Sequence, residues 1–191
     1  GGGTDMITPK SLEPRMQQAR DNGADAVVID INTPGGEMTA MLDICNLFKD
    51  RSDTPANIVA WIHPQAYSAG AIIALACREI VVAPGSIFGD AAPIQIGALG
   101  LQSLGPTERA KILSFIEPEL LDSARRNHYD ENLVQAFVRL TDGLWMLENT
   151  RTGERAFVDR SEYRGIFGAE PPPTLANPPI VPPTAAAPVG A

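Results

Sequence analysis

Residues 26–36 read AVVIDINTPGG, a β-branched run that ends in a proline and two glycines. The run over residues 26–31 is apolar except for one aspartate, which is typical of a buried strand. The Thr-Pro-Gly-Gly that follows predicts a tight loop, because glycine adopts backbone conformations that other residues avoid. Residues 37–49 then predict a helix. Its apolar side chains recur at helical spacing: Met38, Met41, Leu42, Cys45 and Phe48.

The same order of elements recurs along the chain. Residues 58–62 predict a strand, 64–67 a loop, 68–77 a buried helix and 79–83 a further strand. A helix over residues 8–22 precedes the first strand. Strands that alternate with helices form a mostly parallel sheet with right-handed crossovers and helices on its faces. The fold class is therefore α/β.

The remaining sequence predicts less regular elements. Residues 87–105 are rich in Gly, Ala and Pro and predict an irregular loop, and helices are expected over 106–126 and 130–140. Two strands, 144–148 and 155–158, flank Thr-Gly and predict a small C-terminal hairpin.

The C-terminal end of the chain is rich in proline and alanine. Beyond Glu170 it has neither charged nor aromatic residues, so it cannot bury enough surface to offset the entropy of ordering. We therefore expect a domain over residues 1–168 and a disordered linker over residues 169–191.

Composition excludes several functions. The formal net charge of -8 repels phosphate, so nucleic acids and anionic membranes are not expected partners. The longest apolar stretch, residues 69–77, is too short to span a bilayer, and no signal peptide is present. Cys45 and Cys77 lie in apolar helical runs, where we expect free thiols. Their spacing predicts no metal site, and no cofactor is expected.

Two loops carry residues suited to chemistry. In the first, Gly35 and Gly36 open a helix and present backbone N–H groups that can hold a phosphate or the oxyanion of an acyl-transfer intermediate. In the second, Ser68 stands between a predicted strand and helix, where it could be an exposed nucleophile. The structural alternatives are a plain turn and an ordinary helix cap. Both loops follow the carboxyl end of a strand, where α/β sheets bind ligands.

Taken together, INTPGG (residues 31–36), YSAGA (67–71) and VVAPGSIFGDAAPIQIG (81–97) resemble the protease domain of NfeD-type membrane-bound proteases. Signal peptide peptidases, the Clp proteolytic subunit and crotonases belong to the same superfamily. The resemblance spans residues 1–138 and is strongest over 24–97. It implies a Clp/crotonase-like spiral of β-β-α units that lacks its first strand in this chain.

The resemblance also implies how Ser68 is activated. The chain has only two histidines, His63 and His128, and Pro93 lies in the region where the Clp subunit has its catalytic histidine. NfeD-like proteases use a lysine on a helix instead, and Lys111 lies 43 residues after Ser68. A lysine acts as a base when desolvation favours its neutral form.

Helical periodicity places Lys111 opposite the apolar stripe of its helix. It then faces either the active site or a dimer partner.

Further site residues follow from the resemblance by position. The backbone N–H groups of Gly36 and Ala69 would hold the oxyanion. An extended peptide would bind along residues 35–38 and 94–97, and the residues implied are Gly35, Gly70, Ile94 and Gly97. Asp30 is a lesser candidate for a residue of this site.

The resemblance implies a serine endopeptidase that cleaves hydrophobic segments of membrane proteins. It implies a homo-oligomer on the extracytoplasmic side, with membrane contact only through segments that this soluble piece lacks. Two alternatives remain open from the sequence. One is a catalytically inactive scaffold or binding module of the same fold. The other is an acyl-CoA enzyme, although no carboxylate pair accompanies the two loops.

Overall fold

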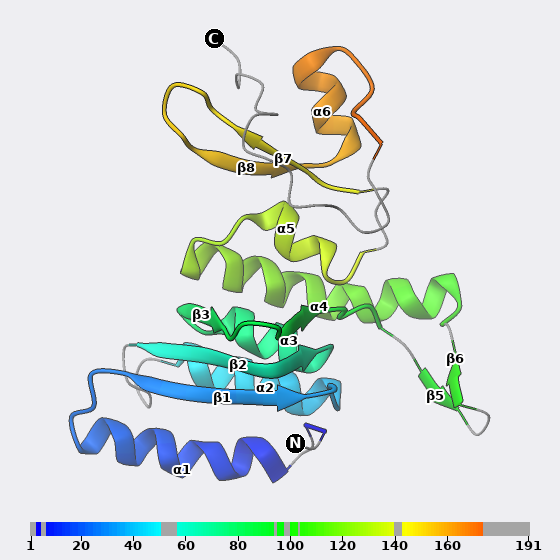
Figure 1. Cartoon of the computed structure of the whole chain (residues 1–191). Coiled ribbons are helices and arrows are strands. Elements are labelled where there is room, and N and C mark those ends of the chain that lie inside the picture. Colours follow the sequence, from blue (N-terminus) through cyan, green and yellow to red (C-terminus); the bar gives the residue numbers. More distant parts are fainter. Residues whose placement is uncertain are drawn as a thin grey trace. The chain divides into compact units, whose positions relative to one another are not determined.

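The structure is a computed structural model (Figure 1). It describes residues 3–4, 7–50, 57–93, 95–97, 100–102, 104–139 and 143–173. The chain divides into two compact units, Gly1–Tyr129 and Asp130–Ala191, which are described separately. The predicted linker lies outside the described residues from position 174 onward. Among the described residues, no helix is both long and apolar enough to cross a bilayer.

The N-terminal unit is built on a parallel sheet. Its strands are β1 (Val27–Thr33), β2 (Ile58–Tyr67), β3 (Glu79–Val82) and β4 (Ile87–Gly89). The order is β1-β2-β3, and β4 pairs with the far end of β2. All three pairings are parallel. The predicted parallel α/β core is therefore confirmed.

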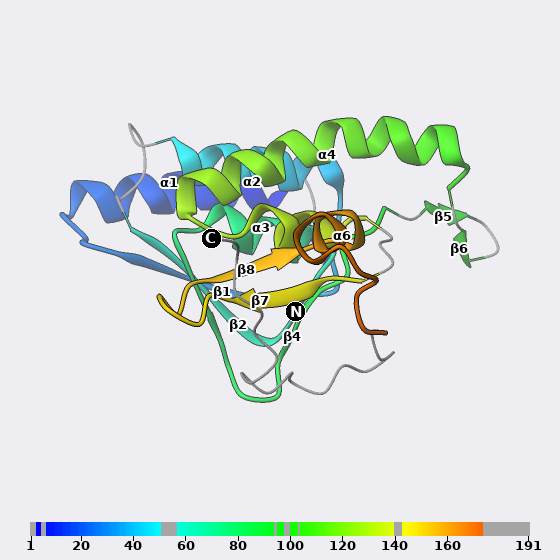
Figure 2. The same ribbon diagram turned by 90° about the horizontal axis from the view of Figure 1, so that it is seen from above.

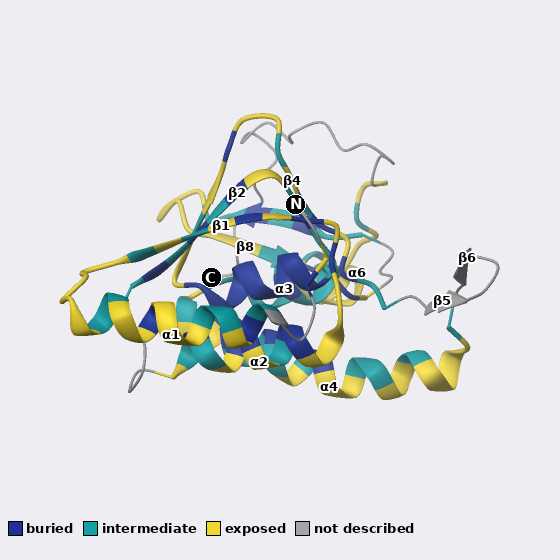
Figure 3. Cartoon of the chain, turned by 90° about the horizontal axis from the view of Figure 1, so that it is seen from below, coloured by how far each residue is buried: buried dark blue, intermediate teal, exposed yellow. Residues whose placement is uncertain are grey.

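Four helices cover one face of this sheet (Figure 3). They are α1 (Ile7–Asp21), α2 (Met38–Lys49), α3 (Ala69–Ala76) and α4 (Pro106–Asn127). All eight residues of α3 are buried, because this helix packs against β2 on one side and against α2 and α4 on others. The opposite face of the sheet is open in this unit, where Val28 is 65% exposed.

The two thiols belong to the core of this unit. Cys45 and Cys77 are both free and buried, as expected. Burial raises the pKa of Cys77 to about 12 and the pKa of Cys45 well above its usual range. Neither residue is therefore a reactive thiolate.

Two predictions for this unit were wrong. Residues 64–67 were expected to form a loop but continue β2, because Ala66 pairs with Thr33 across a bulge and the same stretch pairs with β4. The expected irregular loop 87–105 contains β4, β5 (Gln95–Gly97) and β6 (Gly100–Gln102). For residues 64–67 and β4, strand pairing with residues far along the chain overrides local turn composition, whereas β5 and β6 pair with each other as a local hairpin that the sequence analysis missed.

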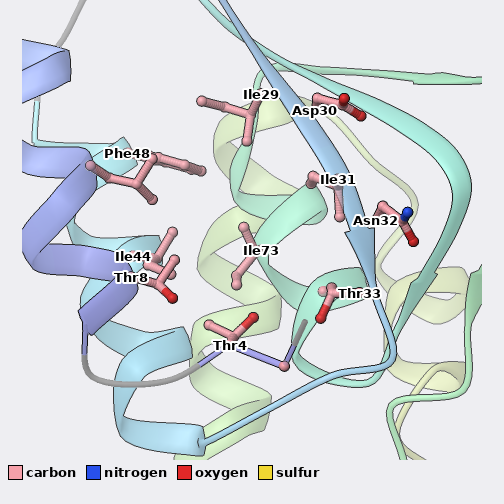
Figure 4. Close-up of a pocket in the computed structure, with 13 residues that line it drawn as sticks. Thr4, Thr8, Ile29, Asp30, Ile31, Asn32, Thr33, Ile44, Phe48 and Ile73 are labelled. Atoms are coloured by element: carbon pink, nitrogen blue, oxygen red, sulfur yellow. The ribbon is translucent and has the colours of Figure 1, made fainter. Parts of the chain in front are cut away.

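A groove of about 320 Å³ runs along the edge of β1 that does not face β2 (Figure 4). Ile29 and Ile31 of β1 face Ile44 and Phe48 of α2 across it, whereas Asp30 and Asn32 point away. Among the described residues, β1 is an edge strand of this sheet, and the groove lies along its outer edge.

The C-terminal unit contains α5 (Glu131–Ala136), β7 (Trp145–Glu148), β8 (Arg155–Val158) and α6 (Arg160–Phe167). β7 and β8 form the predicted antiparallel hairpin. Asp130 caps α5 and also accepts a hydrogen bond from the Phe157 N–H. The sequence did not predict α6, although Asp159 and Glu162 form a capping box at its start.

Candidate active site

Ser68 lies at the junction of β2 and α3 in a strained backbone conformation. Its φ of 52° and ψ of -121° are unusual for a residue with a side chain. The Ser68 N–H donates to the carbonyl oxygens of Gly89 and Asp90, both at 3.1 Å. Asp90 itself has a φ of 48°. Strained residues of this kind cluster at functional sites, because the surrounding structure must hold them in place.

The Ser68 side chain does not cap α3. The helix instead uses the Ser68 carbonyl, which accepts from Ala71 N–H at 3.0 Å and from Ile72 N–H at 3.3 Å. Within the described part of the chain, the half-buried hydroxyl has no hydrogen-bond partner. The helix-cap alternative therefore does not account for this serine, and its hydroxyl is available for chemistry.

Gly35 brings the first loop against Ser68. A Cβ atom on Gly35 would lie 2.7 Å from Ser68 Cβ and 3.2 Å from Ser68 Oγ. Gly35 also has a φ of 121°, which favours glycine. Thr33 fixes the loop, because its hydroxyl donates to Gly35 O at 3.0 Å and accepts from Gly35 N–H at 3.2 Å. The two sequence motifs therefore meet at Ser68.

Gly36 presents its N–H away from the neighbouring backbone. Thr4 forms a parallel bridge with Gly36, in which Thr4 N–H donates to Gly35 O and Glu37 N–H donates to Thr4 O, both at 2.8 Å. The central residue of such a bridge directs its own N–H to the opposite side. Among the described residues this N–H has no partner, as an oxyanion donor requires.

Ala69 and Gly70 begin α3, so their N–H groups have no partner within the helix. The positive end of the helix dipole favours an anion here. A Cβ atom on Gly70 would lie 2.4 Å from the Thr33 methyl group, so glycine lets α3 approach β1 closely. Ala69 follows the strained serine directly and can present its N–H beside the Ser68 hydroxyl.

Lys111 lies on α4 and is exposed. The described residues contain no hydrogen bond between Ser68 Oγ and Lys111 Nζ. The N-terminal half of α4 extends beyond the sheet (Figures 1 and 2). The structure thus brings Gly35, Gly36 and Ala69 together around Ser68, but a single chain does not pair the lysine with the serine.

The remaining candidates lie elsewhere in the chain or outside the described residues. His63 is exposed and stacks on Trp61, and exposed His128 ends α4 with a φ of 60°. Gly97 pairs with Gly100 in the β5–β6 hairpin. Ile94 lies outside the described residues.

A buried ion pair anchors the C-terminal half of α4. Lys49 Nζ lies 2.5 Å from Glu119 Oε1 and 2.8 Å from Asp122 Oδ2, with 9% of the Lys49 side chain exposed. Ser123 Oγ also donates to Glu119. Sequence alone places Lys49 in a structural helix, but it does not reveal that this residue fixes the helix carrying Lys111.

The fold defines the class of protein. The 1510-N membrane-bound stomatin-specific protease, solved as a serine-to-alanine mutant, matches with a TM-score of 0.60 at 22% identity, over 86% of this chain and 72% of that chain. A lysine-to-alanine mutant of the same protease in complex with a substrate peptide matches with a TM-score of 0.62 at 21% identity, over 86% of this chain and 68% of that chain. A ClpP1 mutant from Listeria monocytogenes matches with a TM-score of 0.52 at 14% identity, over 86% of this chain and 82% of that chain. The fold is therefore Clp/crotonase-like, as predicted.

The chain belongs to the family "NfeD1b, N-terminal domain", whose profile matches residues 9–149. Membrane protein NfeD1b of Bacillus subtilis is 34% identical over 119 residues, which are 62% of this chain and 25% of that protein. Membrane-bound protease PH1510 of Pyrococcus horikoshii is 29% identical over 125 residues, which are 63% of this chain and 27% of that protein. The chain thus spans about a quarter of the length of these curated relatives. The resemblance seen in the sequence is confirmed.

Proposed function

We propose that this chain is the catalytic domain of a serine endopeptidase, with Ser68 as the nucleophile and Lys111 as the general base. The observation that carries the proposal is the geometry of Ser68, which is strained, not used as a helix cap and packed against Gly35. The solved relatives support the choice of residue types, since they are a serine-to-alanine mutant and a lysine-to-alanine mutant of a protease.

The reaction follows from these groups. Ser68 Oγ attacks the peptide carbonyl carbon while its proton passes to the neutral Lys111 amine. The N–H groups of Gly36 and Ala69 stabilise the negative charge on the carbonyl oxygen. The lysine then gives the proton to the leaving amine, the C–N bond breaks, and an acyl-serine remains. Water attacks this ester by the same route, with the lysine again as base, and frees the serine.

We infer that the lysine comes from a second copy of the chain. Buried Ile116, which is 5% exposed, and Leu120, which is fully buried, hold α4 against the rest of its unit. Phe115, one turn from Lys111, is 55% exposed, so this half of the helix presents an apolar side chain beside the amine. Association would cover Phe115 and desolvate the lysine, which favours its neutral form.

The proposed substrate is an extended, hydrophobic peptide segment of a membrane protein. It would pair with backbone along residues 35–38, on the side to which Gly36 N–H points. A relative is solved with a substrate peptide, and the curated relatives are membrane proteins by name. The proposed location is the extracytoplasmic side of a membrane.

Cleavage of a fluorogenic library of apolar peptides tests the proposal. We expect the wild-type chain to cleave, and Ser68→Ala and Lys111→Ala each to lose at least ~10³-fold in kcat/KM. Ser114→Ala and Lys10→Ala are matched controls that keep activity. Retained cleavage in either dyad variant contradicts the dyad. An inactive wild-type chain that still binds a partner peptide would favour the scaffold function.

A further inference from the structure

The C-terminal unit holds a short proline segment against a buried aromatic ring. Trp145 Nε1 donates a 2.9 Å hydrogen bond to the carbonyl oxygen of Pro172. The Trp145 ring is 9% exposed and packs beside Tyr163, which in turn contacts Phe167 at 4.5 Å between ring centroids. A buried indole N–H needs a hydrogen-bond partner, and the proline carbonyl supplies it.

Two arginines hold the residue that precedes these prolines. The Glu170 carboxylate pairs with Arg164, and it lies 3.7 Å from Arg160, one turn earlier on α6. Glu170 is the only acidic residue in positions 169–191, although further Pro-Pro pairs follow it. The arginines therefore distinguish this proline segment from the others, since only this one carries a carboxylate.

In the contacts between the two sides, the side chains of the site donate and the segment accepts. A proline has no N–H, so an extended Pro-Pro segment offers only carbonyl acceptors. The Glu170 carboxylate is also an acceptor. Trp145, Arg160 and Arg164 offer only donors. This match is what recognition of a proline-rich segment requires, because a mixed surface would leave some of its polar groups unpaired.

We propose that Trp145, Arg160 and Arg164 form a binding site, here called the acid–proline site, for an extended peptide with a carboxylate two residues before a proline carbonyl. Its occupant is the chain's own Glu170–Pro172 segment. The site is made entirely of residues of the C-terminal unit, and the proposal does not rest on the proposed protease function. Its consequence is that these contacts hold the chain to the C-terminal unit as far as Pro172.

Hydrogen exchange at the tryptophan indoles tests this assignment in the full chain. The chain has two tryptophans, so Trp61 serves as an internal reference. Glu170→Lys should speed exchange of the Trp145 indole proton about fivefold, the loss expected for one hydrogen bond, without changing Trp61. Glu13→Lys is a charge-matched control at an exposed position and should change neither. Unchanged Trp145 exchange in Glu170→Lys overturns the proposal.

A peptide added in trans gives the second test. The peptide AEPPPTL, which copies residues 169–175, should restore slow Trp145 exchange in the Glu170→Lys chain. The peptide AKPPPTL should not. Equal restoration by both peptides would contradict recognition of the carboxylate. Sedimentation at the same concentration should give the same mass for the wild type and for Glu170→Lys. A smaller mass for the variant would assign the occupant to a second copy instead.

Discussion

The two halves of the proposed dyad are built in opposite ways. Ser68 stands in a strained, closely packed loop, where Gly35 leaves no room for a methyl group and two carbonyl oxygens hold its N–H. Lys111 stands on an exposed half-helix next to an exposed phenylalanine. The proposed nucleophile is thus positioned within one chain, whereas the proposed base would depend on association. A protease of this design would be active only when assembled.

Replacing Ser68 should have the largest effect and should separate catalysis from stability. Ser68→Gly should lose at least ~10⁴-fold in kcat/KM, because the nucleophile is gone. The same change should raise the free energy of unfolding by about 1 kcal/mol, since glycine adopts this backbone conformation without strain. Urea unfolding compared with Ser68→Ala, which keeps the strain, measures the difference. Equal stability of the two variants would show that the loop is not strained.

The second largest effect on activity is expected from Gly35→Ala, which crowds Ser68. Gly35→Ala places a methyl group 2.7 Å from Ser68 Cβ, so we expect at least ~100-fold lower kcat from a displaced hydroxyl. Gly85→Ala is the matched control, because Gly85 also has a positive φ but has open space around it. Gly85→Ala should lose about 1 kcal/mol of stability, Gly35→Ala should lose more because of the added clash, and only Gly35→Ala should lose activity. Equal activity of both would remove Gly35 from the site.

Breaking the buried ion pair tests whether α4 is held rigidly. Lys49→Met leaves Glu119 buried without its partner, so the free energy of unfolding should fall by about 3–5 kcal/mol in a urea titration. Lys10→Met, at an exposed position, should change it by less than about 0.5 kcal/mol. A small loss for Lys49→Met would contradict the anchoring of α4 by this ion pair.

The smallest effect concerns acid stability. Burial raises the pKa of Asp122, but Lys49 and Arg126 outweigh it and hold the pKa below its ordinary 3.8. This stabilisation is present above pH 3.8 and is lost as the pH falls through the lower folded value. Its size should stay below about 1 kcal/mol, because 46% of the side chain is exposed. Asp122→Asn should reduce the pH dependence of the free energy of unfolding below pH 4. An unchanged pH dependence would exclude Asp122 as the cause.

Local patterns predicted β1, β3, the β7–β8 hairpin, most of the helices and the position of Ser68 between a strand and a helix, but not β4, β5, β6 or α6. They did not predict that residues 64–67 continue β2, which depends on pairing with β4 far along the chain. Nor did they predict the φ of Ser68 or its contact with Gly35, which arise only when β1 and β2 lie side by side. The base was named from the resemblance alone, since periodicity places Lys111 on the solvent side.

Mixing two inactive chains tests the central claim most directly. Ser68→Ala and Lys111→Ala chains should each be inactive. Equimolar mixing should restore a measurable fraction of wild-type cleavage, because one site of each mixed dimer combines an intact serine with an intact lysine from the other chain. Mixed assemblies demonstrated by mass, with cleavage still absent, would contradict a base supplied by the second copy.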